Sequence, residues 1–322
     1  MTKSILITRQ LEGPAIEQLK QNYNVDMWEE AEVAMPRDEL IKRSAGKQGI
    51  LCMLTEKIDE ELIAAAGPNL ETISTLSVGF DHVDVDVIKQ HGLTLGYTPD
   101  VLSDAVADLT IALMLNAGRR VVEASEQVKA GGWGTWSPYW MTGQDLSGST
   151  VGIVGMGKIA EVVVKRLAGF DCKILYHSRT PKPELELELG IEHRELDQLL
   201  AECDFVTIHA PLTDQTQNIC CNNMFSKMKP SAVFVNTSRG GLVNHDDLYD
   251  ALSSGQIYAA GLDVTSPEPL PTDSPLLSLS NCLVLPHIGS ASIKTRAKMT
   301  TIAVQNLTAG LGDGEFTSQV KL

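Results

Sequence analysis

The sequence predicts an α/β protein with two doubly wound parallel sheets, and three observations support this fold class. The chain has 322 residues, which corresponds to about two domains at roughly 100–200 residues each. Its composition, 43% hydrophobic and 21% charged, is ordinary for a globular protein and excludes a disordered or collagen-like chain. Apolar runs of strand length alternate with helix-like segments almost throughout, which is the pattern of parallel sheets.

The first part of the chain contains four expected strands with helices between them. We expect the strands at Ile5–Thr8, Val25–Trp28, Gly49–Leu54 and Thr72–Leu76. We expect the intervening helices at Pro14–Gln21, Arg37–Ala45 and Asp59–Ala66. Because each strand is followed by a helix, the strands are expected to run parallel in one sheet.

Two longer helical patterns, Val101–Gly118 and Val121–Ala130, interrupt this alternation and have no strand between them. The alternation then resumes, with strands expected at Val151–Val154, Cys172–Tyr176, Phe205–His209, Ala232–Asn236, Tyr258–Leu262 and Cys282–Leu285. The chain therefore reads as two α/β units joined by long helices. Turn-rich loops at Thr180–Pro183 and Thr265–Pro275 lie beside strand ends, where binding residues are commonly found.

The charge balance limits the partners of the protein. There are 26 Lys+Arg and 41 Asp+Glu, a net charge of −15, which repels nucleic-acid backbones and anionic lipid. No apolar run reaches the ~20 residues of a membrane span, and the N-terminal run is too short for a signal peptide. The six cysteines form no C-x-x-C pair, so we expect reduced thiols, a cytoplasmic protein and no metal site. Neither nucleic acid nor a membrane is an expected partner.

A glycine-rich loop follows the expected strand Val151–Val154. It has the form G-x-G-x-x-A, with the residues Gly155-Met156-Gly157-Lys158-Ile159-Ala160. Gly155 permits a tight turn, Gly157 lets the backbone approach a pyrophosphate, and Ala160 lets the following helix pack closely on the strand. A plain strand–helix turn is the alternative interpretation. The strand before the loop and the helix after it, which runs to about Ala168, favour a dinucleotide site.

The end of the next strand bears on which dinucleotide is bound. About 20 residues past the glycines, NAD-dependent enzymes usually place a carboxylate on the ribose 2′-hydroxyl. This chain has His177, Ser178, Arg179 and Thr180 there, with Lys182 nearby. A guanidinium and two hydroxyls can bind a 2′-phosphate, so a preference for NADP(H) is predicted, with NAD(H) possible. The alternative is that Arg179 is only a solvated loop residue.

Three charged residues follow later strands of the same unit. Arg239 follows one strand, Glu268 lies in the loop after another, and His287 follows the last. Each residue alone has an ordinary interpretation, as a surface charge, a loop residue and a core histidine. Because the carboxyl ends of parallel strands meet at one edge of a sheet, the three are expected together beside the cofactor. Their combination predicts an acid–base site.

Several motifs then show a family resemblance over nearly the whole chain. They are Ser77–Asp84, Gly96–Leu102, Gly131–Trp136, the glycine loop, Thr237–Gly240, Gly261–Pro271 and Pro286–Ser290. With these motifs the chain resembles the D-isomer-specific 2-hydroxyacid dehydrogenases, and most closely their glyoxylate reductase/hydroxypyruvate reductase branch. The resemblance implies two Rossmann-like or flavodoxin-like domains. A substrate-binding domain made of residues 1–98 and 290–322 would be split by an NAD(P)-binding Rossmann domain of residues 99–289, and the protein would be a homodimer.

The resemblance also implies roles for the three charged residues. His287 would donate a proton to the substrate carbonyl. Glu268 would pair with His287 and stabilise its imidazolium form near neutral pH. Arg239 would bind the carboxylate of a 2-oxo acid and polarise its carbonyl group.

Further residues are assigned by the same resemblance. The backbone N–H groups of Val78 and Gly79 would bind the substrate carboxylate, and Ser290 would line the pocket. Trp136 would reach the partner subunit's site, with ordinary interface packing as the alternative. Asp263 would orient the nicotinamide amide. The residues implied to contact the cofactor are Gly155, Met156, Gly157, Lys158, Ile159, Ser178, Arg179, Thr180, Pro211, Thr237, Asp263 and Gly289.

The activity implied by the resemblance is NADPH-dependent reduction of hydroxypyruvate to D-glycerate and of glyoxylate to glycolate. Hydride transfer to the carbonyl carbon would be accompanied by proton donation from His287. Two other functions stay open. One is a dehydrogenase for another D-2-hydroxy acid, since residues such as Leu54 and the Trp-rich segment set the pocket. The other is a nucleotide-sensing protein like the C-terminal binding protein corepressors, which resemble the same family.

Overall fold

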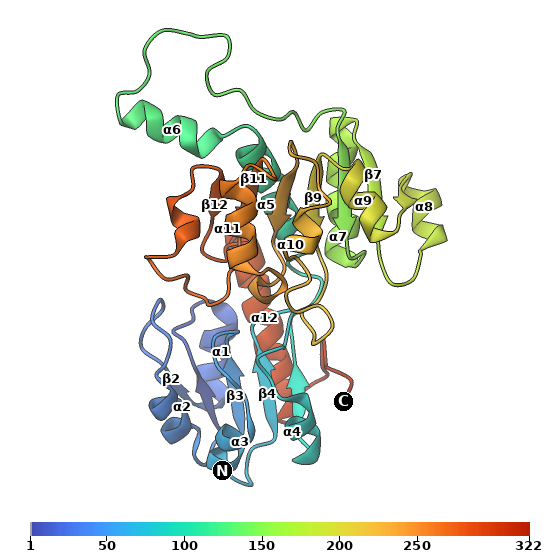
Figure 1. The fold of residues 1–322 in the computed structure, drawn as a ribbon. Coiled ribbons are helices and arrows are strands. Elements are labelled where there is room, and N and C mark those ends of the chain that lie inside the picture. The colour runs from blue at the N-terminus through green and yellow to red at the C-terminus, as the bar shows by residue number, and fades with distance from the viewer. Residues whose placement is uncertain (1) are drawn as a thin grey trace. The chain divides into compact units, whose positions relative to one another are not determined.

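The computed structural model describes residues 2–322 and divides them into two compact units (Figure 1). Unit 1 comprises the chain up to Leu102 together with Ala291–Leu322, and unit 2 comprises Ser103–Ser290. Both units are parallel α/β folds, so the predicted fold class is confirmed. The roles expected for two such domains, substrate binding and NAD(P) binding, stay predictions here.

Unit 1 contains a five-stranded parallel sheet of order β2-β1-β3-β4-β5. Its strands are β1 (Ser4–Ile7), β2 (Asn24–Met27), β3 (Gly49–Cys52), β4 (Thr72–Thr75) and β5 (Thr94–Gly96). The first four confirm the expected strands with ends shifted by one or two residues. The sequence pattern does not predict the fifth strand, since only one of its three residues, Leu95, has a large apolar side chain.

Helices cover both faces of this sheet. They are α1 (Pro14–Asn22), α2 (Arg37–Ser44), α3 (Glu60–Ala66), α4 (Val85–Gln90) and α12 (Ile293–Gly310). The helix α12 packs against β3, β4 and β5, so the C-terminal segment completes the fold that the N-terminal segment begins. Asp59 and Asp84 cap α3 and α4 by accepting hydrogen bonds from backbone N–H groups in the first turn.

Unit 2 contains a seven-stranded parallel sheet of order β12-β11-β10-β9-β6-β7-β8. Its strands are β6 (Thr150–Val154), β7 (Lys173–His177), β8 (Glu192–His193), β9 (Phe205–Ile208), β10 (Val233–Asn236), β11 (Ala259–Leu262) and β12 (Cys282–Val284). All six expected strands are confirmed, and the two-residue β8 is additional. The strand order reverses beside β6, which pairs with both β7 and β9. Ligands of open α/β sheets bind at such a reversal, outside the carboxyl ends of the strands.

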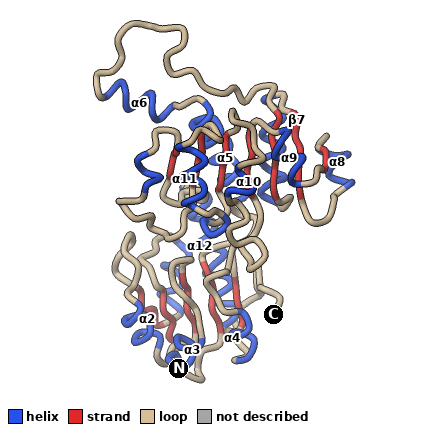
Figure 2. The backbone as a smooth tube through the Cα atoms, in the orientation of Figure 1, coloured by secondary structure: helices blue, strands red, loops and turns tan. Residues whose placement is uncertain are grey.

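Helices also cover both faces of the second sheet (Figure 2). They are α5 (Ser103–Gly118), α6 (Val121–Lys129), α7 (Lys158–Leu167), α8 (Pro183–Leu189), α9 (Leu196–Glu202), α10 (Asn222–Phe225) and α11 (His245–Ser253). Short 3₁₀ helices are Ala168–Phe170, Gly240–Leu242 and Pro275–Ser278. The long helix α5 belongs to unit 2. This helix packs against α7, β10 and β11, because nine of its residues are buried apolar or small side chains.

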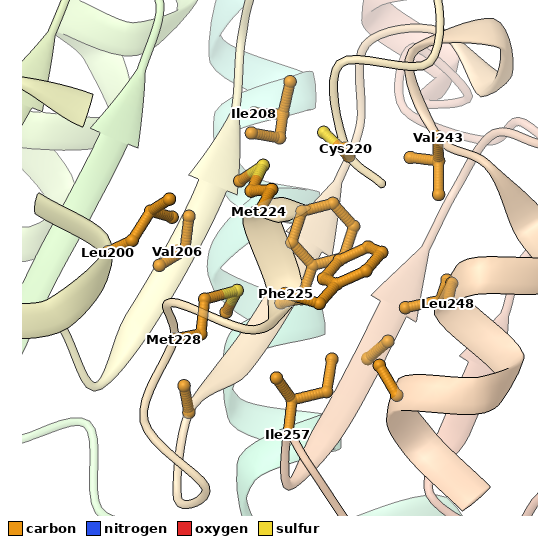
Figure 3. Close-up of a cluster of buried hydrophobic side chains, with 14 of the residues drawn as sticks. Leu200, Val206, Ile208, Cys220, Met224, Phe225, Met228, Val243, Leu248 and Ile257 are labelled. Atoms are coloured by element: carbon orange, nitrogen blue, oxygen red, sulfur yellow. The ribbon is translucent and has the colours of Figure 1, made fainter. Parts of the chain in front are cut away.

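Two buried clusters on opposite faces of this sheet hold unit 2 together. Figure 3 shows part of one, in which Met224, Phe225 and Met228 pack against side chains from β9 and α11. The rings of Phe225 and Phe234 meet edge to face, with centroids 5.4 Å apart. Burial of this apolar surface keeps the strands aligned and thereby fixes the loops at their carboxyl ends. No helix within residues 2–322 has the length and apolar character needed to cross a membrane.

Asp204, just before β9, is expected to stabilise unit 2 in a pH-dependent way. Its carboxylate accepts hydrogen bonds from Thr150 N (2.9 Å) and Lys229 Nζ (2.8 Å). Burial alone would raise the pKa of Asp204, but these hydrogen bonds hold it below its ordinary value. A carboxyl with a depressed folded-state pKa adds stability above its unfolded-state pKa, and this stability is lost as the pH falls. Asp204→Asn should therefore lower the free energy of unfolding by about 1 kcal/mol at pH 7, since Asp204 and Lys229 are one-third exposed.

Urea unfolding at several pH values measures this effect. The difference between wild type and Asp204→Asn should shrink as the pH falls below about 4 and should disappear only below the folded-state pKa of Asp204. Asp197→Asn is the control, because Asp197 pairs with Lys227 while two-thirds exposed and should contribute little. A difference for Asp204→Asn that is independent of pH would contradict the assignment.

Candidate active site

The glycine-rich loop leaves β6 in a conformation that requires glycine. Gly155 has φ 93°, and a Cβ there would lie 2.7 Å from the backbone N of Ala210. A side chain is therefore excluded by both backbone conformation and contact. Gly157 is the N-cap of α7 and has open space where a Cβ would be. The uncapped N–H groups and positive dipole end of α7 fit the pyrophosphate of a dinucleotide, which can approach Gly157 closely.

The loop after β7 lies next to the glycine-rich loop. Gly155 N donates a hydrogen bond to His177 O (2.8 Å), which joins the two loops at their bases. Ser178 Oγ donates to Thr180 O (2.8 Å), and the side chain of Arg179 is exposed. Lys182 Nζ donates to Met156 O within the glycine-rich loop. The sequence places Lys182 near Arg179 along the chain but does not show this contact with the glycine-rich loop, which depends on the fold.

The Arg239 loop is shaped by the last residue of β10. The Asn236 side chain donates to Arg239 O (2.9 Å) and accepts from Ser238 N (3.0 Å), so both ends of its amide restrain the turn. Gly240 then passes so close to the next loop that a Cβ would lie 1.8 Å from Thr265 O. Only glycine permits this approach, and it brings the Arg239 loop against the loop that carries Glu268.

Glu268 and His287 form a hydrogen-bonded pair. His287 Nδ1 lies 2.9 Å from Glu268 Oε2, and Thr265 N donates to Glu268 Oε1 (3.0 Å). Burial alone would raise the pKa of Glu268, but the hydrogen bond and charge of His287, with Thr265 N and the charge of Arg239, hold it below its ordinary value. Glu268 is therefore an ionised acceptor. Since a carboxylate only accepts, Nδ1 of His287 carries a hydrogen and Nε2 is the nitrogen left for a ligand.

Asp263 holds the loop on which His287 stands. It is 1% exposed, and its two carboxylate oxygens accept from Ile288 N and Gly289 N, both at 2.7 Å. Its backbone O accepts from His287 N (2.9 Å), and His287 itself has φ 55°. Burial raises the pKa of Asp263 above its ordinary value, although the two N–H donors oppose this. The family resemblance implies that Asp263 orients the nicotinamide amide, and the structure shows that Asp263 also holds the backbone of the His287 loop.

The other predicted site residues lie in different places. Val78 and Gly79 follow β4 in unit 1, and Ser290 is the last residue of unit 2. Thr237 Oγ1 lies 2.9 Å from Thr110 Oγ1 of α5, and Pro211 follows β9. Trp136, in the segment after α6, is 81% exposed. The structure thus gathers Arg239, Glu268 and His287 on adjoining strand ends of unit 2. Among residues 2–322 no group of three or more His, Cys, Asp or Glu side chains is placed to hold a metal ion.

A dinucleotide loop and an Arg–Glu–His set on adjoining strand ends define a dehydrogenase that uses a nicotinamide cofactor. Comparison with known proteins agrees. Residues 111–289 match the family model described as "D-isomer specific 2-hydroxyacid dehydrogenase, NAD binding domain". The chain belongs to this family, as predicted, and acts on a small hydroxy acid.

Relatives and solved structures match over nearly the full chain. Glyoxylate reductase/hydroxypyruvate reductase of Mus musculus is 48% identical, with 97% of this chain and 95% of the relative covered. The Homo sapiens protein of the same name is 46% identical, with 99% and 98% covered. The TT0316 protein of Thermus thermophilus superimposes with a TM-score of 0.92 at 40% identity, and the match covers 99% of this chain and 100% of that structure. The NADPH-dependent glyoxylate/hydroxypyruvate reductase of Sinorhizobium meliloti, in complex with NADP and malonate, superimposes with a TM-score of 0.84 at 32% identity, and the match covers 99% of this chain and 97% of that structure.

Proposed function

We propose that this protein reduces hydroxypyruvate to D-glycerate and glyoxylate to glycolate with NADPH. The observation that carries the proposal is the Glu268–His287 pair beside Arg239, in the same unit as the dinucleotide loop. The names of the mouse and human relatives support the two substrates. Reaction of hydroxypyruvate with NADPH should give one D-glycerate for each NADPH consumed. Formation of L-glycerate, measured by chiral chromatography, would contradict the proposal.

The bound cofactor supplies a hydride to the carbonyl carbon of the substrate. As the π bond of the carbonyl group breaks, negative charge develops on its oxygen, and His287 Nε2 donates the proton that converts it to a hydroxyl. Glu268 keeps Nδ1 protonated and stabilises the imidazolium from which this proton comes. Arg239 binds the substrate carboxylate and stabilises the developing charge. The backbone N–H groups of Val78 and Gly79 are proposed to bind a carboxylate, and Ser290 is proposed to contact the substrate.

The cofactor contacts follow from the two loops of unit 2. The glycine-rich loop, Met156 to Ile159 included, binds the pyrophosphate, and Ser178, Arg179 and Thr180 bind the 2′-phosphate of NADPH. Lys182 adds a second cation beside them. Pro211, Thr237, Asp263 and Gly289 are proposed to contact the rest of the cofactor.

Arg179→Ala tests the preference for NADPH. The variant should lose about tenfold in kcat/KM for NADPH, because one charge-assisted contact to phosphate is removed. Its kcat/KM for NADH should change little. Arg194→Ala is a suitable control, since Arg194 lies just past β8 but is paired with Glu192. A wild type that prefers NADH, or an equal loss with both cofactors, would contradict the proposed phosphate site.

Glu268→Gln tests the pairing with His287. The substitution keeps the size of the side chain and removes the negative charge next to His287 Nδ1. The variant should lose about tenfold in kcat/KM for hydroxypyruvate at neutral pH, because the positive charge that His287 carries as proton donor is no longer stabilised. An unchanged kcat/KM would show that the pair plays no part in proton donation.

The segment after α6 supports a homodimer. Its aromatic side chains are strongly exposed, with Trp133 at 64%, Trp136 at 81% and Tyr139 at 86%. Large apolar side chains gathered on one exposed segment are typical of a protein interface. We assign this segment to the dimer interface and Trp136 to the partner subunit's site. A cytoplasmic location is part of the same proposal, which the six free cysteines support.

A further inference from the structure

A chain of hydroxyl groups lies behind the turn formed by Ser77, Val78 and Gly79 in unit 1. His82 Nε2 lies 3.0 Å from Thr75 Oγ1, which lies 2.8 Å from Ser77 Oγ. Ser77 Oγ in turn donates to Gly79 O (2.7 Å). Thr75 and Ser77 are buried, so these hydrogen bonds are shielded from water.

The direction of each hydrogen bond in this chain can be worked out. Gly79 O can only accept, so the single hydroxyl hydrogen of Ser77 points to it. Ser77 Oγ must then accept from Thr75, whose only hydrogen is thereby used. Thr75 Oγ1 therefore accepts a hydrogen bond from the N–H group at Nε2 of His82. The four groups form one directional chain that ends on the turn.

The turn is also fastened through its backbone. Thr98 N, after β5, donates to Ser77 O (2.8 Å), and Ile58 N donates to His82 O (2.9 Å). Within residues 2–322, by contrast, no hydrogen bond uses the backbone N–H of Val78 or of Gly79. Both residues are only partly buried. The turn thus holds two consecutive free donors on a backbone that is fixed on either side, which suits an anionic oxygen pair.

We propose that Thr75, Ser77 and His82 are positioning residues that orient the Val78 and Gly79 N–H groups toward the substrate carboxylate. The inference rests on the proposed function, which assigns the carboxylate to these two donors. Gly79 has no side chain to restrict its backbone angles, so the bond from Ser77 Oγ to Gly79 O supplies the restraint. A restrained donor pair binds more tightly because its conformational entropy has been lost in advance.

This arrangement predicts a particular kinetic pattern. The hydroxyl chain acts on the carboxylate and does not touch the reacting carbonyl or the cofactor. Binding that is equal in the ground and transition states changes KM and leaves kcat unchanged. Loss of the chain should therefore raise KM for every 2-oxo acid by a similar factor, whatever the length of its side chain.

Variants of Ser77 and Thr75 test the proposal in the full-length enzyme. Ser77→Ala and Thr75→Val should each raise KM for hydroxypyruvate and glyoxylate about tenfold, with kcat within about twofold and KM for NADPH unchanged. Thr75→Ser keeps the hydroxyl and should restore a KM near that of wild type. Ser74→Ala is the matched control: Ser74 is equally buried on β4, but its hydroxyl donates to Ala303 O of α12 (2.8 Å). A wild-type KM in Ser77→Ala, or an equal rise in Ser74→Ala, would overturn the proposal.

Oxamate binding separates this inference from the proposed function. Oxamate carries the carboxylate of a 2-oxo acid and is not reduced, so its Kd can be titrated calorimetrically in the presence of NADP⁺. If wild type reduces neither acid, the proposed function fails, but oxamate should still bind Ser77→Ala about tenfold more weakly than Ser74→Ala. Equal Kd values in these two variants, or no binding to wild type, would overturn the role of the hydroxyl chain.

Discussion

Replacing His287 by alanine is expected to lower kcat/KM for hydroxypyruvate by about 10³- to 10⁴-fold, within the range found when a general acid is lost. The physical reason is that the carbonyl oxygen would gain full negative charge with no proton donor within reach. Nε2 of His287 is the donor because Nδ1 is held by Glu268. NADPH binding, followed by fluorescence titration, should stay at the wild-type Kd, since the side chain acts on the substrate.

His91→Ala is the control for this variant. His91 is an exposed residue of unit 1 that lies 3.1 Å from Glu60 and has no proposed part in the reaction. The control should retain wild-type kcat/KM. If His287→Ala kept more than about one-tenth of the activity, or lost NADPH binding, His287 would not be the proton donor.

Replacing Arg239 by alanine is expected to cost about 10³-fold in kcat/KM, with both a higher KM and a lower kcat. Two contributions combine here, because the guanidinium binds the carboxylate in the ground state and stabilises the charge that develops on the carbonyl oxygen. The turn that holds Arg239 is fixed mainly by Asn236 and Gly240, and the Arg239 side chain adds one hydrogen bond to Ser238 O (2.8 Å), so thermal unfolding of the variant should be measured beside its kinetics. Steady-state kinetics at saturating NADPH separates the two effects.

Arg239→Lys refines this test. Lysine keeps the charge but loses the planar pair of donors, so an activity between those of wild type and Arg239→Ala is expected. Equal activity of the lysine variant and wild type would show that charge alone suffices. An unchanged kcat/KM in Arg239→Ala would remove Arg239 from the mechanism.

Most of the fold could be predicted because its strands are apolar runs of four or five residues separated by helices. The exceptions are instructive. The strands β5 (Thr-Leu-Gly) and β8 (Glu-His) contain a single large apolar side chain between them, so neither forms an apolar run. The helix α12 was not expected because its buried side includes the polar residues Thr295 and Asn306, which interrupt the apolar repeat. Asn306 is buried because its amide donates to Tyr97 O (2.9 Å), a contact between residues far apart in the chain.

The site shows the same division between local and long-range information. The glycine-rich loop could be predicted because its chemistry lies within six consecutive residues. The support of the His287 loop by Asp263 could not, since Asp263 and its partner Ile288 are 25 residues apart and meet only when β11 and β12 pair. Lys182 and Met156 are separated in the chain in the same way. The family motifs could be read from the sequence, whereas the contacts that orient them required the structure.

Oxidation of NADPH, followed with a panel of 2-oxo acids and with NADH in parallel, measures both the substrate and the cofactor preference of the enzyme. We expect turnover with hydroxypyruvate and glyoxylate, higher kcat/KM for these two acids than for acids with larger side chains, and a preference for NADPH over NADH. A clear preference for a larger 2-oxo acid would point to another D-2-hydroxy acid as the substrate. Absence of turnover with every acid would contradict the account and favour a nucleotide-sensing protein.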